Sequence, residues 1–383
     1  YAREPYYFNT YIKIISPKIA ILIQQYKNLI KTKNQEQLSN IRDIINSSIK
    51  GLDLSNYSED HFTNLLIEAE KKLLKSKHLS GVILFRYNDH NKRQIKSLIN
   101  GIRSLNSNLF IAVDQEGGLV QRLVRSFSEK MPRLSIIKDE YQAAENKTDY
   151  LSVLESRYHS YSAELSELGI THNLAPVCDL DLGCEVISKF GRSAGREVIS
   201  TTKILQAILR GMHNAGIVAC LKHFPGHGGA SADSHFEISK YEDQESLSKE
   251  TEVFKNIIGF CERNKIPCLI MPAHVIYPSI DPNVIATRSS KVLKLAGDYG
   301  FTGDFISDCV TMKGASPKTD LHSIASACLA MSEIKIITLC HYDPIKYLDL
   351  FSLLDPINTG QRVLPEYENQ DLISGTTDVG ATE

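Results

Sequence analysis

Short apolar runs that alternate with longer helical stretches predict an α/β fold, specifically a (β/α)8 TIM-type barrel over residues 49–354. The runs are almost wholly hydrophobic, as strands are when helices cover both faces of a parallel sheet. Seven runs are visible, and an eighth strand is expected to complete a barrel of roughly 300 residues. An open, doubly wound sheet is the structural alternative. The predicted strands lie at residues 81–85, 109–113, 172–177, 217–221, 267–271, 304–306 and 335–339.

The remaining elements follow from length and period. Stretches long enough for helices lie between the strands, for example at residues 150–168, 200–215 and 246–264. Residues 1–48 predict a helical N-terminal extension, because Ser16 and Pro17 suit a helix start and apolar residues recur at three- and four-residue spacing after them. We expect this extension to pack on the main domain. The C-terminal tail, residues 355–383, is polar without a period and is expected to be loosely held.

The composition is typical of a soluble globular protein, with 42% hydrophobic and 23% charged residues. A net charge of -2 gives no basic excess for binding nucleic acid or acidic membranes. No apolar stretch reaches the roughly 18 residues of a membrane span. The eight cysteines form no CxxC pair and are interpreted as reduced thiols, which predicts a reducing compartment such as the cytoplasm. We expect a monomer. Because the chain begins at Tyr1, export after removal of a leader is the alternative.

Titratable residues stand at the ends of four predicted strands. Asp114 follows the second, Lys222 and His223 the fourth, His274 the fifth, and Asp308 the sixth. The carboxyl ends of barrel strands gather around one mouth, where active sites are built. Four such groupings favour an active site over the ordinary start of solvated loops. A carboxylate placed like that of Asp308 is a potential nucleophile.

The segment KHFPGHGGASADSH, residues 222–235, combines histidines with glycines. Proline and glycine predict an irregular loop here, because they stop regular strand pairing. Asp233 lies two residues before His235, and its carboxylate can accept the imidazole N–H, which orients the ring and raises its basicity. Such a pair on a flexible loop suits a general acid/base that swings over a bound substrate.

A metal site is the competing interpretation of this segment. His223 and His227 are four residues apart, but Pro225 and Gly226 between them break the helical geometry that makes such spacing a zinc site. We therefore predict no metal and no cofactor, and expect His227 to hold the loop through backbone hydrogen bonds. The other polar groups suit a ligand covered in hydroxyls, which indicates sugar chemistry; they are Asp114, Arg122, Arg192, Lys222 and His223.

Two motifs resemble one enzyme family. DQEGGLVQR at residues 114–122 resembles the D-Q-E-G-G-R-V-Q-R signature of glycoside hydrolase family 3. KHFPGHG followed by Asp233-Ser234-His235 resembles the signature of its β-N-acetylglucosaminidase branch. The resemblance covers about residues 50–345, and further segments follow the family's order, namely NLAPVCD at 173–179, FGRS at 190–193, MPAHVIY at 271–277 and SDCVTM at 307–312.

The resemblance implies a retaining hydrolase that removes terminal N-acetylglucosamine from peptidoglycan fragments (muropeptides) without a cofactor. Asp308 matches the family's nucleophile, and His235 matches an unusual histidine acid/base whose partner is Asp233. Asp179 matches a position that we take to be structural, bonding its neighbours. The implied substrate-binding residues are Asp114, Arg122, Arg192, Lys222 and His223, with His274 added from its place after a strand.

The chain departs from the family pattern at three positions. Leu119 replaces an arginine and is expected outside the sugar pocket, Ala194 replaces a phenylalanine and is expected to loosen the loop that carries Arg192, and Cys309 follows the matched nucleophile. Three other functions stay open: a phosphorylase, whose anionic acceptor an imidazole tolerates, a non-catalytic sugar-binding protein, and a zinc-dependent hydrolase.

Overall fold

The computed structural model describes residues 71–76, 79–231 and 239–310, and in the C-terminal part residues 312, 314–315, 328, 330–331 and 333–339. The predicted extension at residues 1–48, the tail at 355–383, and both Asp233 and His235 lie outside the described residues. The domain boundaries of the sequence analysis therefore stay predictions.

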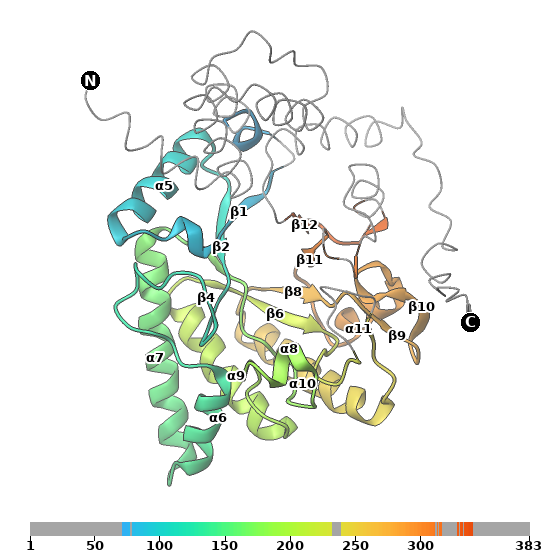
Figure 1. The fold of residues 1–383 in the computed structure, drawn as a ribbon. Coiled ribbons are helices and arrows are strands. Elements are labelled where there is room, and N and C mark those ends of the chain that lie inside the picture. The colour runs from blue at the N-terminus through green and yellow to red at the C-terminus, as the bar shows by residue number, and fades with distance from the viewer. Residues whose placement is uncertain are drawn as a thin grey trace, which may run out of the picture.

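The central feature is a parallel five-stranded sheet in the order β1-β2-β5-β6-β8 (Figure 1). Its strands are β1 (Gly81–Leu84), β2 (Phe110–Val113), β5 (His172–Asn173), β6 (Val218–Phe224) and β8 (Cys268–Pro272). A parallel bridge between Ile270 and Phe305 continues from β8 toward β11 (Ile306–Cys309), which pairs in parallel with β12 (Ile336–Thr338). The α/β class and all seven predicted strands are confirmed. Over the described residues the sheet is open, so closure into a barrel stays a prediction.

Short strands form two small sheets outside the main one. β3 (Gln115–Gly117) and β4 (Val120–Gln121) pair antiparallel directly after β2. β9 (Val275–Tyr277) lies between β7 (Ser239–Lys240) and β10 (Asp281–Ile285). The sequence analysis did not predict them, because they are short and all except β9 contain polar residues. Two 3-10 turns, η2 (Arg86–Asn88) and η3 (Ala286–Arg288), complete these connections.

The three predicted helices correspond to α7 (Lys147–Leu168), α9 (Val198–Asn214) and α10 (Gln244–Asn264). The side chain of Asn146 accepts hydrogen bonds from the first-turn N–H groups of α7, and Gly169 ends that helix with a left-handed φ of 94°. Asp243 caps α10 in the same way. The other helices are α5 (Lys92–Leu105), α6 (Leu134–Ala143), α8 (Glu185–Ser188) and α11 (Ser290–Asp298).

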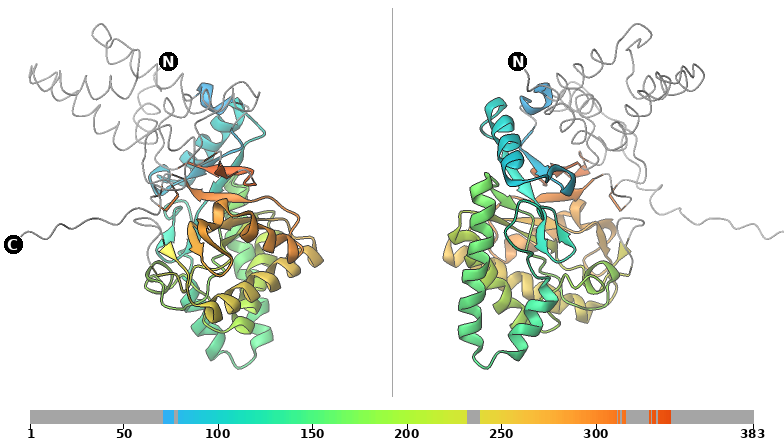
Figure 2. Two further views of the ribbon diagram at one scale, coloured as in Figure 1. Left: turned by 90° about the vertical axis from the view of Figure 1, so that its right-hand side faces the viewer. Right: turned by 60° about the vertical axis from the view of Figure 1, so that its left-hand side comes forward.

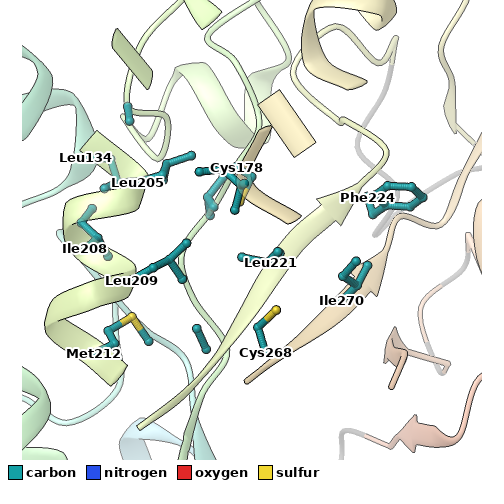
Figure 3. Packing of buried hydrophobic residues seen from close by; sticks show 14 of the residues in the cluster. Leu134, Cys178, Leu205, Ile208, Leu209, Met212, Leu221, Phe224, Cys268 and Ile270 are labelled. Atoms are coloured by element: carbon teal, nitrogen blue, oxygen red, sulfur yellow. The ribbon is translucent and has the colours of Figure 1, made fainter. Parts of the chain in front are cut away.

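The hydrophobic core lies between the sheet and these helices. Apolar side chains of α9 pack toward β6 and β8, as Figure 3 shows; the labelled residues include Leu205, Ile208, Leu209, Met212, Leu221, Cys268 and Ile270. The long helix α7 runs beside α9, which two further views confirm (Figure 2). A Cβ atom on Gly211 of α9 would lie 2.5 Å from the carbonyl oxygen of Glu155 in α7, so the glycine permits this close approach.

Two sequence predictions concern the chain as a whole. The seven cysteines in the described part of the chain carry no disulfide bond, and six of them are buried, as expected for reduced thiols. Within the same residues, no helix is both long enough and apolar enough to span a bilayer.

Candidate active site

The predicted strand-end residues come from four strands, but two strands extend further than expected. Lys222 and His223 lie inside β6, because its pairing with β8 continues to Phe224 and Pro272. Asp308 likewise lies inside β11. His274 is separated from the end of β8 by Ala273. The apolar run therefore marks where a strand begins, and backbone pairing carries it through the polar residues that follow.

Lys222 lies at the centre of a buried network of charges. Its Nζ lies 2.9 Å from Oδ1 of Asp114 and 2.7 Å from Oε1 of Glu116. Glu116 also accepts two hydrogen bonds from Arg192, with Nε at 2.8 Å from Oε2 and Nη2 at 2.9 Å from Oε1. The side chains of Lys222 and Glu116 are each only 4% exposed. Such a bidentate arginine–carboxylate pair fixes the geometry of both partners.

The charges in this network hold one another ionised. Burial opposes the charged form of Glu116, but the charges of Arg192 and Lys222 lower the pKa of its carboxyl far below the ordinary value. Burial likewise disfavours a charged Lys222, whereas Asp114 and Glu116 raise the pKa of its ammonium group above the ordinary value. The network therefore offers fixed donors and acceptors at neutral pH, which suits a polyhydroxyl ligand.

Asp179 forms a second buried cluster. Its Oδ1 accepts hydrogen bonds from the backbone N–H groups of His223 and His227, each at 3.0 Å, and its Oδ2 lies 2.7 Å from Nδ1 of His223. These bonds confirm the prediction that Asp179 binds its neighbours. They favour the His223 tautomer with the proton on Nδ1 and fix the orientation of that ring.

His227 is confirmed as a residue that holds the loop. Its backbone bonds Asp179, and its Nδ1 lies 3.3 Å from Sγ of the buried Cys184. Burial, aided by the charge of His223, lowers the pKa of the His227 imidazole to about 4. In the described part of the chain, no three histidine, cysteine, aspartate or glutamate side chains are grouped as metal ligands.

The neutral His227 predicts a loss of stability in acid. The unfolded state binds a proton near pH 6.5, whereas the folded state binds it only near pH 4, so stability falls as the pH drops through this window. We expect His227 to account for about 2 kcal/mol of the fall in the free energy of unfolding between pH 7 and pH 4.5. Denaturant unfolding of His227→Asn at both pH values should show a smaller fall. The exposed His159→Asn should behave as wild type, and equal falls in all three proteins would contradict the prediction.

Asp308, the predicted nucleophile, lies in β11 with its carboxylate bonded to the adjacent backbone. It is partly exposed, and its Oδ1 accepts a 2.7 Å hydrogen bond from the N–H of Cys309. Its desolvation raises the pKa of the carboxyl, but the charges of His274, His223 and Lys222 together with that N–H lower it below the ordinary value. Pairing of β6 with β8, and the bridge from β8 to Phe305 just before β11, bring these strands side by side.

The remaining predicted residues lie around this centre in different ways. Nη2 of Arg122 is 3.9 Å from Oδ2 of Asp114, and its guanidinium lies over the ring of Phe85 at 5.6 Å. His274 is buried, with Nε2 3.2 Å from the carbonyl oxygen of Cys309 and Nδ1 3.0 Å from Oγ1 of Thr287. These contacts place His274 against the backbone of the segment that carries Asp308.

Two of the three departures from the family pattern, Leu119 and Ala194, differ in their exposure to solvent. Leu119 is 69% exposed, and Ala194 is fully buried. Arg192, which the sequence analysis expected on a loosened loop, is held by Glu116 and by a 3.1 Å hydrogen bond to the carbonyl oxygen of Val186.

Sequence reasoning missed two buried glutamates. Glu116 was part of the quoted DQEGG motif but received no role; its place two residues after Asp114 was the available signal. Glu250 lies in the middle of α10, fully buried, and its carboxyl accepts hydrogen bonds from the backbone of Leu180 and Gly228. No local sequence pattern distinguishes it from a solvent-facing helix residue.

Comparisons with known proteins show what the chain is similar to. The family model described as the glycosyl hydrolase family 3 N-terminal domain matches residues 37–363. A β-hexosaminidase of Tolumonas auensis is 36% identical over 253 residues, covering 64% of this chain and 71% of the relative. One from Neisseria meningitidis serogroup A is 37% identical over 259 residues, covering 65% and 68%. The structure of NagZ from Neisseria gonorrhoeae in complex with N-trifluoroacetyl-D-glucosamine aligns with a TM-score of 0.64 at 30% identity, covering 79% of this chain and 83% of that one.

Proposed function

Because this chain belongs to glycosyl hydrolase family 3 and is therefore a glycoside hydrolase, we propose that it is a retaining β-N-acetylglucosaminidase. Its substrate would be terminal N-acetylglucosamine on peptidoglycan fragments. The observation that carries the proposal is the place of Asp308 in β11, which is bridged to β8 and lies beside His274, with the pKa of its carboxyl lowered below the ordinary value. Relatives named β-hexosaminidase, and a similar structure bound to an N-acylated glucosamine, support the choice of sugar.

In the proposed first step, a carboxylate oxygen of Asp308 attacks the anomeric carbon as the glycosidic C–O bond breaks. His235, protonated beforehand, gives its proton to the departing oxygen, and Asp233 stabilises the ring. In the second step His235 takes a proton from water, whose oxygen attacks the same carbon and releases Asp308. Two inversions give the sugar with its β configuration retained.

The charged network would bind the sugar before this chemistry. The Asp114 carboxylate would accept hydrogen bonds from sugar hydroxyls, while Lys222, Arg192 and Arg122 would donate to ring substituents. Because these groups are already fixed by one another, they need little reorganisation when the sugar binds. His274 would act on the nucleophile rather than on the sugar, since it bonds the residue that follows Asp308.

The proposal includes two broader points. Closure of the sheet into a barrel would set the strand ends around one mouth. A monomeric enzyme in the cytoplasm, acting on muropeptides without a metal or cofactor, would fit the reduced thiols of the described residues.

The stereochemistry of hydrolysis tests the function directly. Incubation with 4-nitrophenyl N-acetyl-β-D-glucosaminide should release 4-nitrophenol, and proton NMR should show β-N-acetylglucosamine as the first anomer formed. The α-linked isomer of the substrate serves as the control and should not react. First appearance of the α anomer would contradict a covalent intermediate on Asp308.

The same assay separates the alternatives. In phosphate buffer, formation of sugar 1-phosphate in place of the free sugar would identify a phosphorylase. Binding of N-acetylglucosamine without turnover would identify a sugar-binding protein. Loss of activity with a chelator and its return with zinc would identify a zinc-dependent hydrolase.

A further inference from the structure

We propose that Glu250 is a positioning residue for the acid step, because its buried carboxyl group holds the turn at residues 226–228 that leads along the chain to Asp233 and His235. This inference rests on the proposed function. It concerns a residue of α10 that does not touch the reacting atoms and would act through the loop.

The carboxyl group of Glu250 joins two separate segments of backbone. Oε1 accepts a hydrogen bond from the N–H of Leu180 at 2.8 Å and from the N–H of Gly228 at 3.0 Å, and Oε2 lies 3.1 Å from the same N–H of Gly228. Leu180 is the neighbour of Asp179, which binds His223. Glu250 therefore fixes the loop relative to the segment that supports the sugar-binding side of the site.

Two glycines allow the loop to lie directly on this carboxyl group. A Cβ atom on Gly226 would lie 2.5 Å from Cβ of Glu250 and 2.8 Å from its Oε2. A Cβ atom on Gly228 would lie 2.8 Å from Oε1 and 1.9 Å from the carbonyl oxygen of Leu180. Real Cβ atoms essentially never approach so closely, so the glycines of the PGHGG stretch serve this contact as well as loop conformation.

Other bonds hold the same turn from different sides. The hydroxyl of Tyr277 donates a 2.5 Å hydrogen bond to the carbonyl oxygen of Gly226. The N–H of Cys184 donates a 2.9 Å hydrogen bond to the carbonyl oxygen of Gly228. Among these partners, only Glu250 accepts the N–H of Gly228. Its removal would leave that buried N–H unsatisfied, which is costly.

The charge state of Glu250 decides the choice of variants. Burial, followed by the charge of Asp179, raises the pKa of the Glu250 carboxyl to about 8. The neutral acid predominates at pH 7, so glutamine is a close substitute that keeps an acceptor oxygen. Alanine removes the acceptor altogether.

The experiment compares kcat/KM for two substrates whose leaving groups differ in their need for a proton. 2,4-Dinitrophenol leaves without one, whereas a sugar alcohol requires general acid help. We expect Glu250→Ala to lose about tenfold to a hundredfold on the disaccharide and less than about threefold on the dinitrophenyl glycoside. Glu250→Gln should stay within about threefold of wild type on both.

Controls separate a positioning role from a structural one. Glu252→Ala changes an exposed carboxylate on the same helix and should leave both rates unchanged. Equal losses of Glu250→Ala on both substrates, or no loss on either, would overturn the inference. If wild type itself cleaves neither substrate, the proposed function fails instead. Should Glu250→Ala not fold, Tyr277→Phe removes one bond from the same turn and should show the same selective loss; an equal loss on both substrates would again overturn it.

Discussion

Asp308→Ala is expected to lower kcat for N-acetyl-β-glucosaminides on the order of 10⁴-fold or more. The variant lacks the carboxylate that forms the covalent intermediate, and no other group of this strand end replaces it. The variant should still fold, because Asp308 is partly exposed and its carboxylate hydrogen-bonds the N–H of the adjacent Cys309. Turnover of the chromogenic substrate and the melting temperature should be measured together. A rate equal to wild type would reject Asp308 as nucleophile.

A matched control and a chemical label sharpen this result. Asp304 lies just before β11 and pairs with the exposed Lys335 at 2.5 Å, so Asp304→Ala should keep full activity. A 2-fluoro N-acetylglucosamine analogue with a good leaving group should add its mass to the peptide that contains Asp308. A label on any other residue would contradict the assignment.

Lys222→Met is the second large expected effect, and it combines stability with binding. Methionine fills much of the volume but leaves Asp114 without its 2.9 Å partner in a largely buried place, while Glu116 keeps only Arg192. Breaking a buried ion pair by removing one partner costs about 3–5 kcal/mol. We expect a fall of that size in the free energy of unfolding by urea, and a rise in KM because a donor to the sugar is lost.

The double variant Asp114→Asn with Lys222→Met tests the origin of the loss. If an uncompensated charge is responsible, the double variant should be less destabilised than the sum of the single variants. Lys249→Met, which breaks an exposed ion pair with Glu245 on α10, should change stability by less than about 1 kcal/mol. Simple additivity of the two single changes would contradict the coupled network.

The strands could be predicted because their apolar runs are a local signal. The extent of β6 could not, because Lys222 becomes acceptable inside a buried strand only when Asp114, 108 residues earlier, and Glu116 neutralise it. Likewise the β3–β4 hairpin depends on the short turn at residues 118–119 rather than on hydrophobic periodicity. Local pattern therefore located the elements, and long-range pairing decided where they end.

In the candidate site, too, some residues could be predicted from local pattern and others depend on long-range contacts. The strand-end rule found Asp114, Lys222, His274 and Asp308, since the topology of a parallel sheet brings such ends together. Glu250 escaped it because its partners are backbone N–H groups 70 and 22 residues away in the sequence. A helix residue that accepts hydrogen bonds from distant backbone N–H groups cannot be recognised from residue spacing or composition.

Asp179 has a consequence for anyone who wishes to redesign this protein. One carboxylate binds both the ring of His223 and the backbone of His227, so the end of β6 and the start of the following loop are held together. Changes at residues 226–228 would be transmitted to the sugar side through that shared clamp.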